Sequence, residues 1–370
     1  MLGGVPTAVE TTRRALAELG HEVVVVAPRM RGAAPEPNVL RVPALPAPMY
    51  PDFALPLPLS LALARALRER AFDVFHAHHP FLLGQAALRL ARRTGRPLVF
   101  THHTLYDKYA HYVPLPTRFV ARLAIARSTR FANAADLVLV PSVALAARLT
   151  AQGVRRPIEV VPTGVDLDRF RPGDRPTVRQ ALGLPQDAPL LVYVGRLDPE
   201  KNLPFLLDAF ASVAARHPTV ELLLVGRGTQ ENGLRHHAGR LGIASRVRFA
   251  GGIPPSDVAR RYQAGDLFVF ASTTETQGLA VLEAMATGLP VVAVRAIGVE
   301  EAVVDGVSGL LVPEDPRVFA DAVLSILRDA GLAAKLAAGG RDAAGTISTR
   351  TLAERLVALY ERLGAVPGSP

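Results

Sequence analysis

Two acidic side chains flank a glycine in residues 274–286, and their spacing limits the chemistry they can do. Glu275 precedes a predicted helix, and Glu283 lies about two turns along it, so the two cannot act together as acid and base on one bond. They suit hydrogen bonds to hydroxyl groups at the two ends of an extended ligand. Gly278 allows close backbone approach, and the amides of 278–280 at a helix start would bind a diphosphate. The alternative is a capped helix with a solvated glutamate.

Two cations follow a predicted strand in the stretch Gly195-Arg196-Leu197-Asp198-Pro199-Glu200-Lys201-Asn202. A loop between a strand and a helix places Arg196 and Lys201 at the carboxyl edge of a sheet. Two cations there can neutralise a leaving diphosphate, and arginine can bind it through two hydrogen bonds. The alternative is a pair of surface cations that form ion pairs with Asp198 and Glu200.

Six of the ten histidines fall within residues 76–111, and two groups of them directly follow predicted strands. We considered a metal site, since histidine is a common ligand. No carboxylate or cysteine cluster accompanies them, so recognition of a sugar or of a second substrate is favoured and no metal site is predicted. Tyrosines interleaved with polar residues at 106–112 could line the entrance for that substrate, or form one face of an amphipathic helix. The candidates are His78, His79, His102, Tyr106, Tyr109, His111 and Tyr112.

Both halves of the chain alternate short apolar strands with helices, which is the pattern of two doubly wound parallel sheets. The predicted strands are 23–27, 73–75, 98–100, 137–140, 190–194, 221–225, 247–249, 267–270 and 291–294. Ligands bind such sheets at the carboxyl ends of the strands. We therefore expect a site in a cleft between two facing sheets.

The domain boundaries follow from composition. We expect residues 1–165 to form one domain with 346–370 packing back on it, and 189–345 to form the other. Residues 166–188, rich in proline, glycine and charge, are predicted to be the linker. The proline-rich segment 35–58 is predicted to be a surface connection. Glycine occurs at positions 3 and 4 without a strand before it, so the first strand of domain one is expected to be missing.

Charge is unevenly distributed along the 370 residues. Residues 1–165 hold 20 Lys/Arg and 10 Asp/Glu, and the net charge of the whole chain is +9. This basic half suggests an anionic partner, such as a membrane surface, a nucleic acid or a phosphorylated substrate. The chain has no cysteine, which excludes disulfides, thiolate metal sites and a cysteine nucleophile. It also has no apolar run long enough to span a membrane and no signal-peptide pattern at its start.

Five motifs together resemble the retaining nucleotide-sugar glycosyltransferases of family 4, which have the two-Rossmann-domain (GT-B) architecture. They are Gly3-Gly4-Val5, Pro162-Thr163-Gly164-Val165-Asp166, Gly195-Arg196 with Lys201, the Glu275/Glu283 pair and Asp305-Gly306-Val307-Ser308-Gly309-Leu310-Leu311-Val312. Within this family, residues 76–84, residues 101–113 and Gln277 resemble bacterial diacylglycerol glucosyltransferases. The resemblance implies that the first domain binds the acceptor and the second domain the nucleotide sugar.

The resemblance also implies individual roles. Arg196 and Lys201 would stabilise the donor diphosphate, Glu283 would hold ribose hydroxyls and Glu275 sugar hydroxyls. His103 would lie near the reacting end of the sugar, and the base near Arg227 and the loop 250–253. The implied catalytic residues are His103, Arg196, Lys201 and Glu275. The implied donor site adds Gly3, Gly4, Arg227, Gly251, Ile253, Gln277, Gly278, Leu279, Ala280 and Glu283.

The expected reaction moves a hexose from a nucleotide diphosphate sugar, UDP-glucose by resemblance, to a lipid hydroxyl such as that of diacylglycerol. Fixed positive charge and amide dipoles would replace a metal ion, no cofactor is expected, and the acceptor would attack from the face that the diphosphate leaves. Arg118 and Arg122 predict docking on an anionic membrane from the cytoplasmic side. Alternatives are a soluble acceptor, a nucleotide-sugar epimerase and a nucleic-acid-binding module, for which no zinc spacing or recognition helix is present.

Overall fold

The computed structural model describes residues 4–29, 36–47, 50–57, 67, 70–107 and 116–364. These residues form two compact units, which are described separately. The C-terminal unit comprises Thr163–Thr349 together with the start of the chain as far as Thr7. The N-terminal unit comprises Ala8–Pro162 together with Arg350–Pro370.

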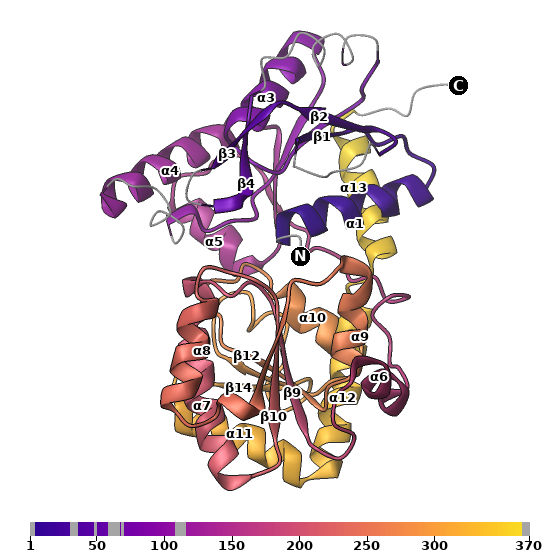
Figure 1. The fold of residues 1–370 in the computed structure, drawn as a ribbon. Coiled ribbons are helices and arrows are strands. Elements are labelled where there is room, and N and C mark those ends of the chain that lie inside the picture. Colours follow the sequence, from indigo (N-terminus) through magenta and orange to yellow (C-terminus); the bar gives the residue numbers. More distant parts are fainter. Residues whose placement is uncertain are drawn as a thin grey trace. The chain divides into compact units, whose positions relative to one another are not determined.

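The C-terminal unit is built on one six-stranded parallel sheet with the order β11-β10-β9-β12-β13-β14. This is the Rossmann arrangement, in which the strand order reverses between the first and the fourth strand, here β9 and β12. Helices α7, α8 and α11 cover one face and α9, α10 and α12 the other (Figure 1). The strands are β9 (Leu190–Val194), β10 (Glu221–Val225), β11 (Val247–Gly251), β12 (Leu267–Phe270), β13 (Val291–Val294) and β14 (Leu310–Val312). The helices are α6 (Arg175–Leu182), α7 (Leu203–Arg216), α8 (Glu231–Arg240), α9 (Val258–Gln263), α10 (Leu279–Ala286), α11 (Pro316–Arg328) and α12 (Ala330–Gly345), with short 3₁₀ turns η2 (Pro199–Lys201), η3 (Ala244–Arg246) and η4 (Pro255–Asp257).

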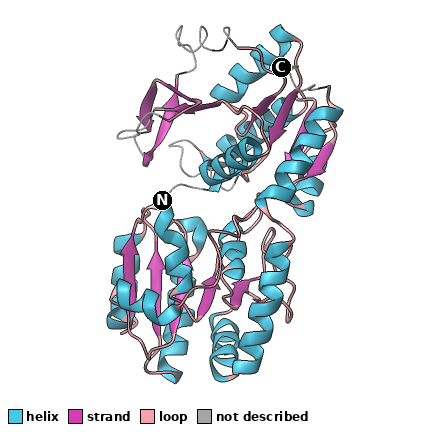
Figure 2. Ribbon diagram, turned by 90° about the vertical axis from the view of Figure 1, so that its right-hand side faces the viewer, coloured by secondary structure: helices cyan, strands magenta, loops and turns pink. Residues whose placement is uncertain are grey.

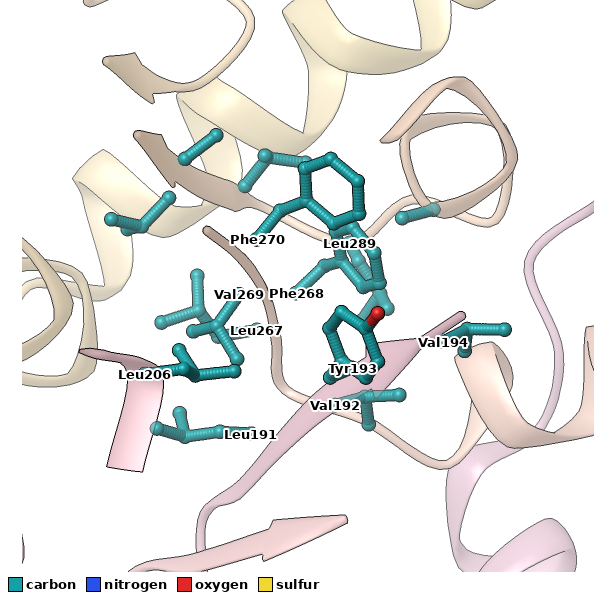
Figure 3. Packing of buried hydrophobic residues seen from close by; sticks show 14 of the residues in the cluster. Leu191, Val192, Tyr193, Val194, Leu206, Leu267, Phe268, Val269, Phe270 and Leu289 are labelled. Atoms are coloured by element: carbon teal, nitrogen blue, oxygen red, sulfur yellow. The ribbon is translucent and has the colours of Figure 1, made fainter. Parts of the chain in front are cut away.

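The two central strands have no exposed face. Every residue of β9 and of β12 is buried, as expected when helices cover both sides of a parallel sheet. Figure 3 shows their side chains packed with Leu206 and Leu289. The Tyr193 ring stacks on Phe270 with centroids 6.1 Å apart. Burial of each such aromatic ring contributes about 2–3 kcal/mol, so the sheet is a rigid base for the loops that leave its edge.

The N-terminal unit carries three smaller sheets. The largest has the parallel order β5-β6-β7-β8, and β1-β2 and β3-β4 form a parallel and an antiparallel pair. Figure 2 shows the helices of the unit around these strands. The strands are β1 (Val25–Pro28), β2 (Val39–Val42), β3 (Ala44–Ala47), β4 (Tyr50–Pro56), β5 (Phe75–Ala77), β6 (Leu98–Thr101), β7 (Leu137–Val140) and β8 (Ile158–Val160). The helices are α1 (Gly4–Glu18), α3 (Leu82–Thr94), α4 (Thr117–Ala132), α5 (Val143–Ala151) and α13 (Thr349–Arg362).

Two segments contain more structure than their composition predicts. The proline-rich segment 35–58, predicted to be a surface connection, contains β2, β3 and β4, so that prediction is wrong. Its Pro46 and Pro56 lie in a two-stranded sheet, where edge positions tolerate a missing N–H. The predicted linker 166–188 contains α6 and contributes Phe170 and Val178 to the buried core.

Helix length also bears on membrane insertion. Within the residues that the structure describes, no helix combines the length and apolarity needed to cross a bilayer.

Candidate active site

Four loops at the carboxyl edge of the C-terminal sheet carry the predicted donor-site residues. They follow β9, β10, β11 and β12, and the reversal of strand order places the first and the last of them on neighbouring strands. A positive φ of 148° at Gly226 allows the β10 loop to approach the β9 loop, since a Cβ there would lie 1.8 Å from the carbonyl oxygen of Gly195. The sequence therefore folds the loops tightly against one another at the point where such sheets bind ligands.

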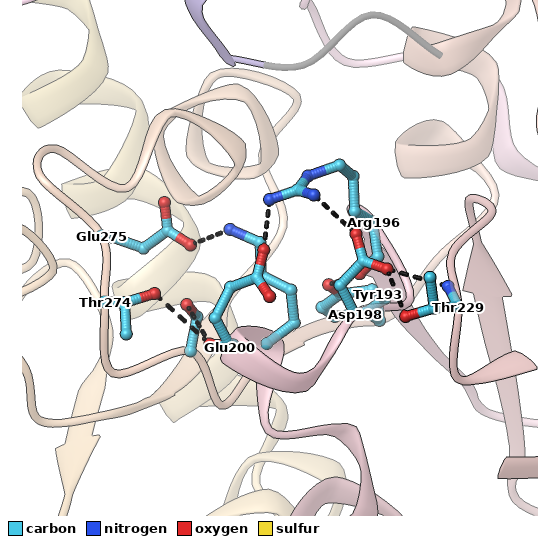
Figure 4. A network of polar contacts seen from close by, with 9 residues as sticks. Tyr193, Arg196, Asp198, Glu200, Thr229, Thr274 and Glu275 are labelled. Carbon is cyan, nitrogen blue, oxygen red and sulfur yellow. Dashed lines mark hydrogen bonds and ion pairs between the residues drawn. The ribbon is translucent and has the colours of Figure 1, made fainter. Parts of the chain in front are cut away.

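Arg196 is held by two carboxylates (Figure 4). Its Nη1 donates to Asp198 Oδ2 at 2.6 Å and its Nη2 donates to Glu200. Asp198 and Glu200 are buried, with side chains only 1% and 2% exposed. Asp198 Oδ1 also accepts from the Thr229 amide at 2.8 Å, which ties the β9 loop to the β10 loop. The guanidinium therefore has one fixed orientation at the mouth of the sheet.

The backbone around Arg196 is anchored to the core. The buried Tyr193 hydroxyl donates to the Arg196 carbonyl oxygen at 2.9 Å. The carbonyl oxygen of Glu200 accepts from Ser272 Oγ at 3.2 Å. These contacts join the loops after β9 and β12, as Figure 4 shows. The predicted pairing of Arg196 with Asp198 and Glu200 is present. Both carboxylates are buried, however, so these are not ion pairs between solvated surface groups.

Lys201 and Glu275 form an ion pair across the point where the strand order reverses. Nζ of Lys201 lies 2.5 Å from Oε1 of Glu275, and the side chains are 13% and 19% exposed. Burial alone would raise the pKa of Glu275, but Lys201, Ser272 and Arg196 more than offset it, so this pKa lies below its usual value. The pair is therefore fully ionised at neutral pH.

The segment before α10 is fixed by the Gln277 side chain, which both accepts and donates a hydrogen bond as a backbone amide would. Oε1 of Gln277 accepts from the Thr163 amide at 2.7 Å, and Nε2 donates to the Thr163 carbonyl at 2.7 Å. Gln277 is 9% exposed, so both bonds are sheltered from water. Gln277 is thus engaged with the Pro162-Thr163-Gly164 motif, a contact that no sequence spacing indicated.

Helix α10 starts at a glycine in the left-handed conformation. Gly278 has φ 70° and is the N-cap, and the amides of Leu279 and Ala280 form the first turn. Such first-turn amides have no acceptor within their own helix. The helix start therefore has the geometry that the sequence predicts for binding an anion.

Glu283 lies about one turn along α10 and contacts a buried tyrosine. The Tyr262 hydroxyl donates to Glu283 Oε2 at 2.9 Å. Burial raises the pKa of Glu283 to about 7, partly offset by that hydrogen bond and by the charge of Arg169. Glu283 is therefore partly protonated at neutral pH, unlike Glu275.

The residues predicted near the base lie together. Arg227 is exposed, and a Cβ on Gly252 would lie 3.0 Å from its Cδ. The Gly226 amide donates to the carbonyl oxygen of Gly251 at 3.0 Å, and Ile253 is buried. The side chain of Arg227 therefore runs along the loop that follows β11.

Histidines occupy the carboxyl edge of the N-terminal sheet. His76 is hydrogen-bonded through Nδ1 to the Tyr360 hydroxyl and through Nε2 to Thr101 Oγ1, both at 2.6 Å. His78 Nδ1 lies 2.9 Å from His103 Nε2, and the rings of His76 and His78 stack at 4.2 Å. Burial lowers the pKa of His78 to about 4 and that of His103 well below its ordinary value. These rings are therefore neutral, and one ring of the 78–103 pair must donate the proton they share.

The structure describes three of the other predicted acceptor residues, His79, His102 and Tyr106. His102 is 4% exposed and its Nε2 is hydrogen-bonded to Ser128 Oγ at 3.0 Å, so it packs into the unit. His79 and Tyr106 lie edge to face with ring centroids 5.9 Å apart. Tyr109, His111 and Tyr112, like Gly3, lie outside the described residues. Gly4 begins α1 and is exposed.

No group of three histidine or carboxylate side chains in the described parts of the chain is arranged to hold a metal ion. The neighbouring histidines instead bond to one another, to hydroxyls and to a tyrosine on α13.

Sequence reasoning missed the residues that hold the predicted ones in place. Tyr262, Thr229 and Tyr360 act through contacts that span 21 to 284 residues of chain. No local spacing could have identified them.

Comparison with known protein families gives two matches. Residues 2–169 match the profile described as Glycosyltransferase Family 4, and residues 174–343 match Glycosyl transferases group 1. D-inositol 3-phosphate glycosyltransferase of Frankia alni is 38% identical over 91% of this chain and 89% of its own. Alpha-monoglucosyldiacylglycerol synthase of Streptococcus pneumoniae is 32% identical over 79% of this chain and 68% of its own.

Solved structures agree with the predicted fold. Sucrose-phosphate synthase from Thermosynechococcus elongatus superposes with a TM-score of 0.84 at 26% identity, covering 98% of this chain and 94% of its own. Anabaena Alr3699/HepE in complex with UDP superposes with a TM-score of 0.72 at 25% identity, covering 88% and 86%. The expected two-domain α/β fold of the GT-B type is therefore confirmed.

Proposed function

The chain belongs to the family 4 glycosyltransferases and uses a nucleotide sugar, and from this premise we propose that it moves glucose from UDP-glucose to a lipid hydroxyl with retention of configuration. The Lys201–Glu275 ion pair carries the proposal, because it places a cation and a hydroxyl-binding carboxylate side by side at the ligand edge of the sheet. The structure of Anabaena Alr3699/HepE was solved in complex with UDP, which supports a uridine nucleotide in the donor.

Donor binding exchanges one ion pair for another. A diphosphate that reaches Lys201 replaces Glu275 as its partner, and Glu275 is then available to accept hydrogen bonds from the sugar hydroxyls. The buried carboxylates of Asp198 and Glu200 keep Arg196 oriented throughout. The amides at the start of α10 complete the anion site.

Bond cleavage depends on stabilising the leaving group. Lys201, Arg196 and the α10 amides stabilise the negative charge that grows on the diphosphate as the sugar–oxygen bond breaks. The acceptor hydroxyl attacks the oxocarbenium-like sugar from the same face, and the departing diphosphate takes its proton. No carboxylate nucleophile is needed, which distinguishes this route from that of retaining glycosidases. No metal ion or cofactor is part of the proposal.

Glu283 is the proposed partner of the ribose hydroxyls, with Arg227 and the loop 250–253 beside the base. Tyr262 orients Glu283 through its 2.9 Å hydrogen bond. On the N-terminal unit, His103 is the proposed sugar contact, and the neutral His78 fixes the position of its ring proton.

The lipid acceptor is supported by two observations. One relative is named Alpha-monoglucosyldiacylglycerol synthase. The start of α4 exposes Phe119 (60%) and Leu123 (41%) beside the exposed arginines Arg118 and Arg122. Apolar and cationic side chains together suit an anionic bilayer surface, where each cation contributes about 1 kcal/mol.

A phosphorylated polyol is the second candidate acceptor. The Frankia relative, which covers more of this chain, is named for inositol 3-phosphate. The histidines and tyrosines at the N-terminal sheet edge provide the neutral hydrogen-bonding groups that a polyol needs.

A donor-by-acceptor screen with the purified chain tests the proposal. UDP-glucose is incubated with dispersed diacylglycerol, with inositol 3-phosphate or with no acceptor, and NMR reads the anomer of the product. An α-glucosyl lipid formed equally well in chelator supports the proposal. Turnover of the donor alone would indicate an epimerase, and loss of activity in chelator would contradict the metal-free route.

Membrane docking is tested with liposomes containing phosphatidylglycerol. We expect Arg118→Glu/Arg122→Glu to lower co-sedimentation at least about tenfold, because two charge reversals remove about 2 kcal/mol or more. The matched control is Arg89→Glu/Arg93→Glu on α3, where both arginines are also exposed. Equal binding of the two variants would refute docking through α4.

A further inference from the structure

The N-terminal unit has a groove of about 940 Å³ that the sugar-transfer proposal does not use. Leu98, the first residue of β6, and Asp136, which precedes β7, line its floor. The groove therefore lies at the amino ends of these strands, whereas His102 and His103 follow the carboxyl end of β6. The two sites are on opposite edges of the same sheet.

Five arginines line this groove. They are Arg92, Arg96, Arg130, Arg155 and Arg156. All five are exposed, and Asp136 is the one carboxylate among the lining residues that the structure describes. Asp136 accepts a hydrogen bond from the Leu98 amide at 2.8 Å, so its carboxylate is bonded to the backbone at the edge of the sheet. Arg96 lies 3.8 Å from Asp73, with both side chains 42% exposed, which is a weak pair in water. The groove thus carries a strong positive potential.

One asparagine holds the backbone of Arg155 and the side chain of Arg156. Asn133 accepts from the Arg155 amide through Oδ1 at 2.7 Å and donates from Nδ2 to the Gly153 carbonyl at 2.9 Å. Nε of Arg156 donates to the Asn133 carbonyl oxygen at 3.2 Å. The loop after α5 is therefore clamped to the end of α4, and the wall of the groove does not depend on a ligand for its shape.

Helix ends account for only part of this charge. Arg92 and Arg130 lie in the last turns of α3 and α4, where cations offset the partial negative charge of the final carbonyls. Arg96, Arg155 and Arg156 lie in loops beyond the helices, so the helix dipoles do not explain them. Like charges gathered in one groove repel each other, and an anion would remove that repulsion.

We propose that this groove binds a soluble compound carrying two or more phosphate groups. Guanidinium groups bind phosphate oxygens through paired hydrogen bonds, and several arginines around one cavity suit several phosphates. A bilayer is disfavoured because no large apolar residue that is exposed in the described chain lines the groove. The exposed apolar residues of α4, Phe119 and Leu123, lie toward the N-terminal end of that helix, about 10–16 Å along its axis from Arg130.

Calorimetry with inorganic tripolyphosphate tests the site in the full-length protein. We expect binding that weakens as NaCl is raised, and that becomes at least about tenfold weaker in Arg92→Gln/Arg130→Gln. The control is Arg89→Gln/Arg93→Gln, which removes two exposed arginines from the same region of α3 but none that line the groove. Arg155→Gln gives an independent variant in the loop after α5 should the double variant fold poorly.

Each outcome decides the proposal. Weaker binding in the groove variants alone supports it, and continued binding in a Lys201→Ala background separates it from the donor site. Equal losses in the control, or no loss in either groove variant, would overturn it. Binding to phosphatidylglycerol vesicles that needs the groove arginines, without tripolyphosphate binding, would overturn the soluble ligand.

Discussion

The carboxyl edges of the two sheets differ in their electrostatics. In the C-terminal unit, Arg196 and Lys201 are ionised and already paired with carboxylates that are largely sheltered from water. In the N-terminal unit, His76, His78 and His103 are uncharged, because burial lowers their pKa values far below neutrality. Both edges are the carboxyl ends of parallel strands, so topology places the site and side-chain chemistry decides what it binds.

The two edges therefore suit different tasks: one suits neutralising the charge of a ligand, and the other suits orienting a ligand through hydrogen bonds. The first edge can receive an anion by exchanging ion pairs, while the second can orient hydroxyl groups without attracting charge. Variants on one edge should therefore alter donor affinity, and variants on the other should alter turnover.

The largest effect is expected for Lys201→Ala. Loss of a cation from the proposed diphosphate site should lower kcat/KM about 100- to 1000-fold and weaken UDP binding, because one of the charges that would stabilise the leaving group is then missing. Lys335→Ala, which removes an exposed lysine elsewhere in the same unit, should change neither. Steady-state kinetics measures kcat/KM, and UDP titration measures the affinity. Unaltered UDP affinity in Lys201→Ala would contradict the proposed difference between the two edges.

A smaller effect is expected for His78→Leu. Without the contact to His78 Nδ1 at 2.9 Å, the ring of His103 is held less firmly, and kcat should fall about 10- to 100-fold. UDP affinity should stay unchanged, and His78→Asn should recover part of the rate because an amide can still hydrogen-bond. A matching loss of UDP binding would show that the two edges are not functionally separate.

Gln277→Ala tests a structural contact within the charged edge. Loss of both bonds to Thr163 should lower the free energy of unfolding by about 1–3 kcal/mol, since the backbone groups of Thr163 then have no such partner. Urea unfolding measures this change. Gln180→Ala at an exposed position is the control, with an expected change within about 0.5 kcal/mol.

The smallest effect concerns pH. Because the pKa of Glu283 is raised to about 7, UDP affinity should rise about fivefold from pH 6 to pH 8 as the carboxylate becomes the stronger acceptor. Glu283→Gln should abolish this dependence, and persistence of the titration in that variant would assign it to another group.

The same group has the opposite effect on stability. The folded chain keeps a proton on Glu283 that the unfolded chain releases, since the unfolded pKa is the ordinary carboxyl value. The free energy of unfolding should therefore decrease as pH rises toward and through about 7, and less so in Glu283→Gln.

Strand and helix patterning predicted the second sheet well. The run Leu190-Leu191-Val192-Tyr193-Val194 and the run Leu267-Phe268-Val269-Phe270 are fully buried strands, as their continuous apolarity indicates. Residues 35–58 were misread because proline normally breaks a sheet, and only three-dimensional pairing shows that edge positions accept it.

The candidate site was predictable as residue types and not as partnerships. Arg196, Lys201 and Glu275 could be identified from motifs, but the pairing of Lys201 with Glu275 joins residues 74 apart in sequence. Gln277 was assigned to the donor site by resemblance, but its two hydrogen bonds to the backbone of Thr163 were not predicted. Tertiary contacts of this kind leave no periodic signal for sequence analysis to detect.

The hydrogen bond between His76 and Tyr360 on α13 joins residues 284 positions apart. During synthesis, the strands that carry the histidines leave the ribosome long before α13 is translated. The sheet edge that carries the histidines therefore lacks the Tyr360 contact while residues 163–349 of the other unit are translated. It gains this contact only near the end of translation. Nascent chains halted before residue 349 should thus hold the six strands of the C-terminal sheet but lack the Tyr360 contact of the N-terminal one.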